Sequence, residues 1–215
     1  MQAAAVRATA ERRVPSSWWV AKRTIDLGLG SLLALIALPI VALASLGIIA
    51  VTGGAPFYAQ ERIGQFGRRF KMYKLRTMVE NAHELRHEVM HLNEADGPVF
   101  KIRNDPRLHP LGRLLRRTSI DELPNLLNVL RGDMSLVGPR PALPSEIADY
   151  DAYARRRLLV PQGVTCLWQI GGRSDLAFEQ WMELDNEYVE TWTPLGDIEI
   201  IFKTIPAVLR KDGAH

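Results

Sequence analysis

The most apolar part of the chain lies near its N-terminal end, in residues 27–51. No charged side chain occurs from residue 27 to residue 60, and at about 1.5 Å per residue the apolar part is long enough to cross a bilayer core of about 30 Å as a helix. It is too long and too far from the N-terminus for an ordinary signal peptide. The pattern therefore predicts a retained membrane helix that ends at residues 53–56 (GGAP).

Two arrangements of this helix fit its flanks. Basic residues occur on both sides, so the positive-inside rule gives no preferred orientation, and Pro39 near the middle kinks or breaks the helix. The segment is either a kinked single pass or a helix–break–helix hairpin that enters and leaves on one face. From the residues alone we favour the single pass, which is the commoner arrangement. The residues just before the apolar part are typical of a membrane–water interface, and they are Trp18, Trp19, Lys22 and Arg23.

Shorter patterns follow the membrane helix. Residues 57–75 predict a β-ribbon that turns at residues 64–67, and residues 79–94 predict a helix with one apolar side. Residues 96–115 carry the turn signals of a loop, and residues 161–175 hold a glycine-rich loop that is too weak a pattern for a phosphate site.

Three later segments have helical spacing. Residues 145–159 predict a helix with Arg155, Arg156 and Arg157 on its outer face, and with an inner face formed by Ile147, Tyr150, Ala154 and Leu158. Residues 176–192 carry a core stripe, which consists of Phe178, Trp181, Met182, Tyr188 and Val189. Residues 198–209 are apolar with basic neighbours, which fits a helix in the plane of the membrane interface and a buried terminal helix about equally.

A leucine repeat at positions 123, 126, 127 and 130 predicts a helix that ends at Gly132. Its start can be drawn in two ways. Ser119 and Glu122 fit a capping box, but Pro124 then lies inside the helix and costs a hydrogen bond. With Asp121 as the N-cap, Pro124 falls in the first turn, where its missing N–H costs nothing. We prefer the second start.

Composition narrows the class of protein only a little. The chain has 215 residues, enough for one domain with a membrane element, and its net charge of +3 with a pI near 9.2 suits an anionic lipid surface or phosphorylated substrates. This charge is weak evidence for nucleic acid, and we expect no nucleic-acid partner. The single cysteine, Cys166, excludes an internal disulfide and fits a reducing compartment.

Residues 83–91 contain the pattern H-E-x-x-H twice, in which a helix presents two histidines on one face to zinc. A zinc peptidase would need a third ligand and a substrate cleft, and this segment is too polar to form the wall of a buried site. We therefore interpret it as a charged, solvated helix in which histidine recurs every four residues.

The candidate chemistry lies at Asp121 and Glu122, adjacent carboxylates that follow Arg116 and Arg117. A helix start favours anions, so Asp121 is a simple cap on one interpretation. On the other, the acidic pair holds a divalent cation, binds a phosphorylated substrate and keeps an ionised carboxylate ready to attack phosphorus. The residues alone leave these two interpretations even. Farther on, Arg140 lies between Pro139 and Pro141, which makes either a stiff turn with an exposed arginine or a preformed phosphate contact.

Several motifs in a fixed order carry a family resemblance: residues 22–26 (KRTID), the apolar segment with Pro39, and residues 60–64 (QERIG), 74–78 (KLRTM), 121–124 (DELP), 138–141 (GPRP), 167–170 (LWQI) with Gly172 and Arg173, and 203–206 (KTIP). Together they resemble the bacterial sugar transferases, the monotopic phosphoglycosyl transferases. The resemblance covers nearly everything from residue 22 to the C-terminus, and it is to a short member that carries the catalytic region without the extra membrane domain of longer relatives.

The resemblance implies a mainly α fold with a small β-ribbon, in a monotopic membrane protein with interfacial amphipathic helices. It implies a flexible tail in residues 1–17, a re-entrant membrane helix in residues 18–54, and a catalytic domain in residues 55–215 on the cytoplasmic face of the bacterial inner membrane. This reverses our preference for the single pass and accounts for the basic residues on both flanks.

The resemblance also implies a reaction. Family members transfer a sugar phosphate from a UDP-sugar to undecaprenyl phosphate and release UMP, with Mg²⁺ as cofactor. Asp121 matches the nucleophile, which forms a phosphosugar–aspartyl intermediate in a ping-pong mechanism, and Glu122 joins it in binding the metal or handles a proton. Arg116 and Arg140 match arginines near the phosphates, and Lys74 and Arg76 are further candidates for phosphate binding.

Two positions depart from the family pattern. Leu38 precedes Pro39, where some relatives carry a serine, and residues 161–163 (PQG) replace the more usual Pro-Gly order. The motifs after Gly163 look most like members that handle UDP-hexoses in exopolysaccharide or O-antigen assembly, which suggests galactose or glucose by analogy. The sequence leaves the sugar, the polysaccharide and the formation of a homodimer open. A non-enzymatic membrane-anchored adaptor that binds anionic lipid and a partner protein is the alternative function.

Overall fold

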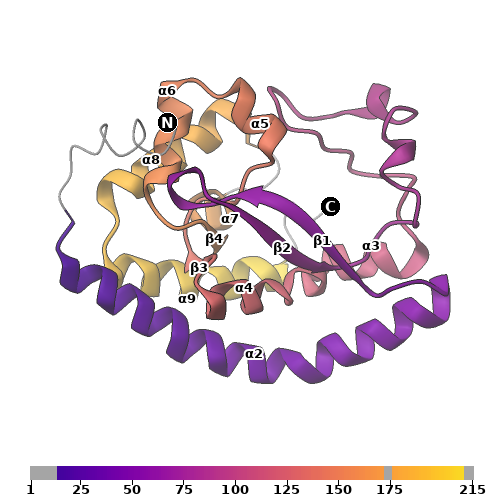
Figure 1. Cartoon of the computed structure of the whole chain (residues 1–215), viewed down its shortest axis with the longest axis horizontal. Helices are drawn as coiled ribbons and strands as arrows, with labels where there is room; N and C mark the ends of the chain where they lie inside the picture. Colours follow the sequence, from indigo (N-terminus) through magenta and orange to yellow (C-terminus); the bar gives the residue numbers. More distant parts are fainter. Residues whose placement is uncertain (1–13, 172–175, 211–215) are drawn as a thin grey trace.

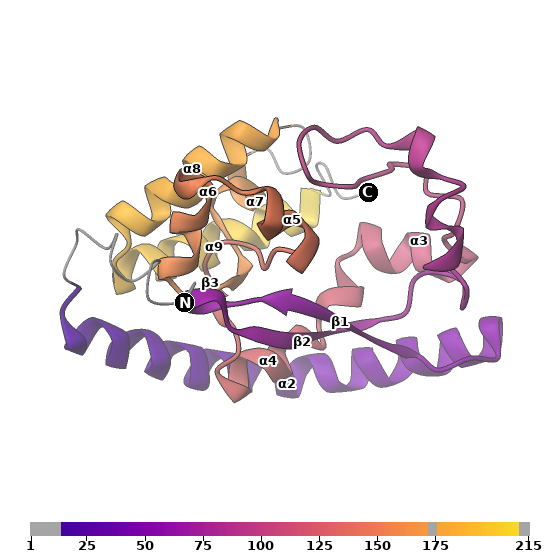
Figure 2. The same ribbon diagram turned by 45° about the horizontal axis from the view of Figure 1, so that its top comes forward.

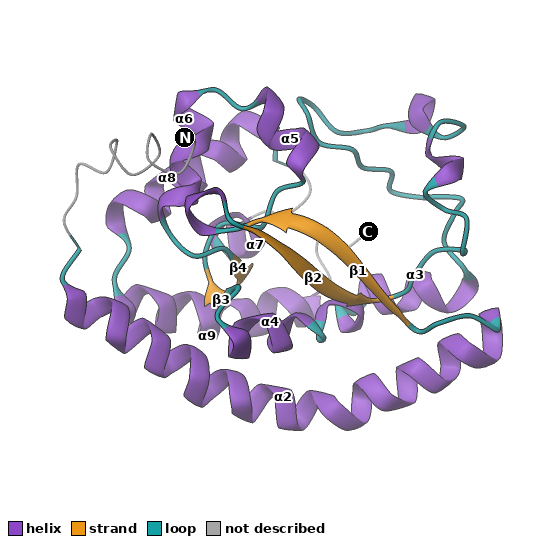
Figure 3. Cartoon of the chain, viewed as in Figure 1, coloured by secondary structure: helices purple, strands orange, loops and turns teal. Residues whose placement is uncertain are grey.

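The computed structural model describes residues 14–171 and 176–210. The described chain is mainly helical, as the family resemblance implies, with two small two-stranded sheets (Figure 3), of which the first was expected and the second was not. Most of the tail expected in residues 1–17, and Gly172 and Arg173 of the glycine-rich loop, lie outside the described residues.

One long helix, α2, runs along one side of the molecule, and the rest of the chain lies on its other side (Figures 1 and 2). It spans Ser16–Thr52, continues through Pro39 and ends at Gly53, whose left-handed backbone (φ 68°) suits glycine. Within the described ranges it is the one helix long and apolar enough to cross a membrane. Figure 1 shows it bowed, with both ends bending toward the other elements. The re-entrant hairpin stays a prediction.

The N-terminal part of α2 is bound to the domain by buried polar contacts. Lys22, which is 3% exposed, forms an ion pair of 2.6 Å with Asp197 and donates to the carbonyl of Val137 at 2.9 Å. Asp26 accepts hydrogen bonds from the Ser135 hydroxyl and the Leu136 N–H. The prediction that Lys22 lies at a membrane–water interface is therefore wrong, because its charge is used to attach α2 to the domain.

Arg23 and the two tryptophans make further contacts of this kind. The Arg23 guanidinium donates to the carbonyls of Val129 and Leu130, near the end of the neighbouring helix α4, where unpaired carbonyls favour a cation. Trp19 stacks on Trp192 at 4.5 Å, and Trp18 meets the same ring edge-on. Arg23 and both tryptophans are half-buried, so for these three residues the interfacial interpretation stays a prediction.

The C-terminal part of α2 is also packed against the domain. Ile48 is fully buried in a cluster with Leu75 and Leu115, and Val41, Ala44, Leu111 and Ile120 lie around it. Both ends of the apolar helix therefore contact the same body of protein.

The β-ribbon is confirmed: β1 (Phe57–Ile63) pairs antiparallel with β2 (Arg69–Leu75), and the short 3-10 helix η1 (Gln65–Gly67) connects the two strands. It rests on helix α4 (Asn125–Arg131), where the buried Asn128 side chain accepts from the Tyr73 N–H and donates to the Lys71 carbonyl. An asparagine thus satisfies two backbone groups of the ribbon that no third strand covers.

Two predictions for the segment after the ribbon are wrong in part. Residues 79–94 are not one helix but a series of turns with two short 3-10 helices, η2 (Glu84–Arg86) and η3 (Met90–Leu92). The end of the expected loop, from residue 110 on, belongs to helix α3 (Pro110–Arg117). The helix begins with a proline, which pre-sets its first backbone angle, and His109 caps it by accepting from the Gly112 N–H.

The remaining elements form the second half of the domain. Strand β3 (Ser135–Val137) pairs parallel with β4 (Gly163–Thr165). In place of the single helix expected in residues 145–159 there are three short helices, α5 (Pro144–Asp149), α6 (Ala152–Arg155) and η5 (Arg156–Leu159). The helices α7 (Leu167–Gly171) and α8 (Phe178–Thr191) follow β4.

The inner face predicted for residues 145–159 is confirmed, because Ile147, Tyr150, Ala154 and Leu158 are buried. Arg157 was expected on the outer face and is only 4% exposed, since it forms an ion pair of 2.8 Å with the buried Asp185. The core stripe of residues 176–192 is confirmed at Met182 and Tyr188.

The last helix, α9 (Pro194–Arg210), is buried on one side and exposed on the other. Asp197 and Ile200 are buried against the domain, whereas Leu195 is 78% and Phe202 68% exposed. Large apolar side chains on the outside are what a helix in the membrane interface requires, so this arrangement favours the interfacial alternative over a buried terminal helix.

Candidate active site

The two adjacent carboxylates lie on a tight turn of their own before helix α4. Ser119 has a positive φ of 56°, and residues Ile120–Glu122 form the 3-10 helix η4. Helix α4 begins at Asn125 with Pro124 at its N-cap, so the preferred assignment of Asp121 as the N-cap is wrong. The predicted end at Gly132 is confirmed, but Leu127 is 44% exposed while Asn125 and Asn128 are fully buried. A strained residue just before the acidic pair is a feature that recurs at functional sites.

Asp121 is the carboxylate without a partner. It is 6% exposed, and within the described ranges its side chain takes part in no hydrogen bond or ion-pair contact. The pKa of Asp121 is raised to about 6, because burial and the neighbouring Glu122 carboxylate together outweigh the opposite effect of Lys74, Arg116 and Arg140. At neutral pH Asp121 is therefore an ionised, poorly solvated carboxylate with free oxygens.

Both carboxylate oxygens of Glu122 accept hydrogen bonds from cationic side chains. Its Oε1 accepts from Lys74 Nζ at 2.8 Å, and Arg140 reaches both carboxylate oxygens, at 2.5 Å and 3.2 Å. These cations hold the pKa of Glu122 well below its usual range, although burial acts against them. Lys74, whose pKa is lowered by burial, is kept in place by the same contact. The two carboxylates thus have different roles: Glu122 fixes the cations, and Asp121 stays available.

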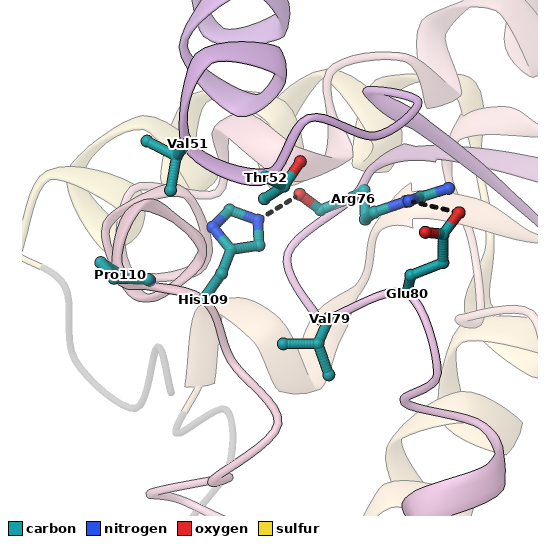
Figure 4. Close-up of a pocket in the computed structure, with 7 residues that line it drawn as sticks. All are labelled: Val51, Thr52, Arg76, Val79, Glu80, His109 and Pro110. Carbon is teal, nitrogen blue, oxygen red and sulfur yellow. Dashed lines mark hydrogen bonds and ion pairs between the residues drawn. The ribbon is translucent and has the colours of Figure 1, made fainter.

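All six predicted site residues line one cleft, and two of the arginines also make contacts outside this group. Arg116 acts electrostatically on Asp121 and donates from Nε to the Thr77 hydroxyl at 3.1 Å. The Arg76 guanidinium instead points toward Glu80, 3.7 Å away, in a side pocket of about 200 Å³ at the end of α2 (Figure 4). The carbonyl of Arg76 accepts a hydrogen bond from His109, as the same figure shows.

A large cleft of about 1350 Å³ contains the acidic pair. One of its walls is apolar and comes from the two outer helices: Leu29, Leu33, Ile36 and Ile40 of α2, with Ile198, Ile201, Phe202 and Ile205 of α9. Another part of the wall is polar and includes Gln60, Arg62, Lys74, Arg116, Arg140 and Gln169. A single space therefore joins an apolar surface on the membrane-type helix to a cluster of cations around Asp121.

Sequence reasoning missed residues that support the site from behind. Arg157 donates to the Arg140 carbonyl at 2.7 Å and to the Tyr150 hydroxyl at 2.9 Å, and both Arg140 and Tyr150 line the cleft. Arg62 also lies in the wall, and its only sequence signal is its place in the QERIG motif. Contacts that join residues so far apart in the chain leave no local pattern.

The carboxylates fit a magnesium ion only in part. Mg²⁺ takes one or two carboxylates together with substrate phosphates, and Asp121 offers free oxygens for this. Both Glu122 oxygens are already covered by Lys74 and Arg140. Nowhere in residues 14–171 and 176–210 do three or more His, Cys, Asp or Glu side chains group in a way that could hold a metal. The histidines of the H-E-x-x-H pattern lie on turns and 3-10 helices, so the helical face that this pattern requires is not formed.

Comparison with known proteins relates the chain to one protein family. The model of the family described as bacterial sugar transferase matches residues 17–211. The chain is 43% identical over 199 residues to the UDP-galactose-lipid carrier transferase of Erwinia amylovora, covering 90% of this chain and 41% of that protein. It is 42% identical over 201 residues to the exopolysaccharide production protein ExoY of Sinorhizobium fredii, covering 91% and 88%.

The name of a third relative contains both substrates of that protein. The UDP-glucose:undecaprenyl-phosphate glucose-1-phosphate transferase of Caulobacter vibrioides is 38% identical over 205 residues, which cover 90% of this chain and 72% of that protein. The chain thus spans about two-fifths of one of these relatives and most of the other two. With a family model that matches nearly its whole length, the chain belongs to the bacterial sugar transferases.

Proposed function

We propose that the chain transfers a hexose 1-phosphate from a UDP-hexose, galactose or glucose, to undecaprenyl phosphate and releases UMP. The observation that carries this proposal is Asp121, a buried carboxylate with free oxygens among Lys74, Arg116 and Arg140. Ion pairs neutralise its neighbour Glu122, so a dianionic diphosphate can approach the remaining cations without meeting two bare carboxylates.

The transfer takes place in two displacements at phosphorus. A carboxylate oxygen of Asp121 attacks the sugar-bearing phosphorus, the bond from this phosphorus to the bridging oxygen breaks, and UMP leaves with that oxygen. A phosphate oxygen of undecaprenyl phosphate then attacks the same phosphorus, and the acyl phosphate bond to Asp121 breaks. The carboxylate is regenerated without net gain or loss of a proton. Two steps let a soluble nucleotide and a bulky lipid use one site in turn.

The residues around Asp121 have separate tasks in this scheme. Arg116 and Arg140 stabilise the charge on the phosphates, and Lys74 with Glu122 holds Arg140 in position. Mg²⁺, bound by Asp121 and substrate phosphates, would neutralise the leaving UMP. Arg76 lines the same cleft, but its guanidinium is 3.7 Å from Glu80, so we assign it no contact with the phosphates.

The two walls of the cleft match the two substrates. The apolar wall formed by α2 and α9 suits the polyprenyl chain, and the polar wall suits the nucleotide sugar. We further propose that α2 enters and leaves the cytoplasmic face of the inner membrane. Support for this comes from the contacts that both ends of α2 make with one domain, through Lys22 at one end and Ile48 at the other.

The test is UMP release by the detergent-solubilised protein with undecaprenyl phosphate and Mg²⁺, across a panel of UDP-sugars. Release with one or two UDP-hexoses, abolished by Asp121→Asn and by EDTA, is the expected result. Asp149→Asn, at an exposed carboxylate on α5, is the matched control and should keep full activity. No release from any UDP-sugar by folded protein would refute the transferase and leave the adaptor, for which Asp121→Asn has no effect.

A further inference from the structure

Arg62 is a cation in the wall of the cleft to which the proposed mechanism gives no role. Arg62 lies on β1 and lines the cleft together with Asp121, Glu122 and Arg140. Burial and the nearby Arg140 guanidinium lower the pKa of Arg62 to about 10, so it remains positively charged at neutral pH.

The Arg62 guanidinium is held by neutral groups. It donates to the Pro141 carbonyl at 2.9 Å and to the Gln60 side-chain oxygen at 2.7 Å. No carboxylate of the described ranges is in ion-pair contact with it, and its buried Nε–H has no hydrogen-bond partner there. A guanidinium has five N–H donors, so most of them remain unused.

The carboxylates that attract Arg62 from a distance are occupied elsewhere. Glu122 is bound by Lys74 and Arg140, and Glu146 accepts the Leu143 N–H at the start of α5. Arg62 is a half-buried cation beside a second guanidinium, and such a charge is unfavourable unless a bound anion compensates it. The hydrogen bond to Pro141 fixes Arg62 next to Arg140, and so the fold maintains the pair of like charges.

We propose that Arg62 binds a phosphate group of a substrate in this cleft, beside Arg140. The free N–H donors of its planar guanidinium match the geometry of phosphate oxygens. A bound phosphate would supply the anionic acceptors that the described part of the protein does not provide for Arg62. This inference rests on the proposed function, whose two substrates both carry phosphate. The diphosphate of the nucleotide sugar and the phosphate of the lipid share the chemistry that Arg62 recognises.

The experiment compares Arg62→Gln and Arg62→Met with the wild type. Arg69→Gln is the matched control, because Arg69 lies on the paired strand β2 and its ion pair with Glu61 is exposed (68% and 51%). KM is measured for the UDP-hexose and for undecaprenyl phosphate in turn, with the other substrate saturating. The rise in melting temperature caused by inorganic pyrophosphate is measured as a readout that is independent of turnover.

We expect the Arg62 variants to raise KM for one substrate on the order of tenfold, with a smaller change in kcat, since the contact is made on binding. The substrate whose KM rises identifies the source of the phosphate. The pyrophosphate shift should be lost in these variants and kept in Arg69→Gln. Arg62→Met retains the packing of the side-chain stem, so it decides the matter if Arg62→Gln does not fold.

Wild-type KM for both substrates together with an unchanged pyrophosphate shift, in either folded variant, would overturn the proposal. Its failure is separable from that of the proposed function. If the wild type releases no UMP, the transferase is refuted, and the pyrophosphate shift still decides whether Arg62 binds phosphate.

Discussion

At the scale of single residues, the site depends on an asymmetry between two neighbours. Asp121 and Glu122 are adjacent in the chain, yet burial raises the pKa of Asp121 to about 6 while Lys74 and Arg140 lower that of Glu122. Groups whose pKa values are pushed apart in this way take different tasks in a reaction. The asymmetry follows from which carboxylate the cations touch.

The raised pKa predicts a pH profile for the first displacement. Ionised Asp121 is the attacking form, so the burst of UMP released without lipid should be lost as the pH falls through about 6. Leaving out undecaprenyl phosphate removes the titration of its phosphate from the profile. Stopped-flow or quenched measurements from pH 5 to pH 8 check this, and a rate constant that is flat over the range would contradict it.

The same pKa shift predicts that ionised Asp121 destabilises the folded protein. Because its folded pKa lies above the unfolded value of 3.8, the folded state binds the proton more tightly, and the free energy of unfolding falls as the pH rises from about 4 to about 6. Asp121→Asn removes this cost and should stabilise the ligand-free protein at pH 7.5 by up to about 3 kcal/mol, from 1.36 kcal/mol per pKa unit. Melting temperatures measure it, with Asp149→Asn as control. A lower melting temperature for Asp121→Asn would show that the carboxylate is stabilising.

At the scale of elements, buried polar contacts decide how α2 is joined to the domain. Residues 22–26 combine a cation and an anion that reach β3 and α9 from one face of the helix. The charge of Lys22 indicated a membrane surface when only the sequence was considered. Asp197, the partner of Lys22, is 175 residues away from it, and no local pattern reveals such a pair.

Lys22→Met should weaken the attachment of α2 to the domain, because it removes the ion pair with Asp197. The change leaves Asp197 buried without its counter-charge and should lower stability by about 3–5 kcal/mol, because an unpaired buried charge is strongly unfavourable. Lys203→Met is the matched control on α9, since its ion pair with Glu199 is exposed (60% and 65%) and is worth about 0.5 kcal/mol or less. Thermal unfolding in detergent compares the two. Equal decreases in melting temperature would mean that the ion pair of Lys22 stabilises the protein no more than the exposed pair of Lys203 does.

At the scale of the whole molecule, α2 and α9 present exposed apolar side chains next to the cleft that contains Asp121. Leu35, Leu38 and Leu43 on α2 are 69%, 65% and 73% exposed. Such a surface is unfavourable in water and fits a bilayer, from which a polyprenyl lipid can reach the apolar wall of the cleft.

The contacts at both ends of α2 predict its topology. With Cys166 replaced by serine, single cysteines at Ser17 and Gly54, which flank the apolar part, should both react with a membrane-impermeant thiol reagent in inverted vesicles and not in intact cells. A single pass would place the two cysteines on opposite faces, and labelling of only one of them in each preparation would therefore contradict the proposed arrangement.

The sequence by itself determined the apolar helix, the β-ribbon, the end of α4 at Gly132 and the identity of the candidate residues. These depend on periodicity, on turn residues and on motifs in order, all of which are local. It did not determine the helix boundaries in residues 79–117 and 145–159, where short turns interrupt the pattern because tertiary contacts override weak helical preferences.

Only the tertiary structure decided which charges meet. It paired Arg76 with Glu80, buried Lys22 and Arg157, and placed Arg62 in the wall of the cleft without a counter-ion among the residues that the structure describes. The energy of a charge depends on its burial and on partners from distant parts of the chain, and both are properties of the folded state. The residue types that the chemistry needs are therefore readable from the sequence, and their tasks are set by the packing that brings them together.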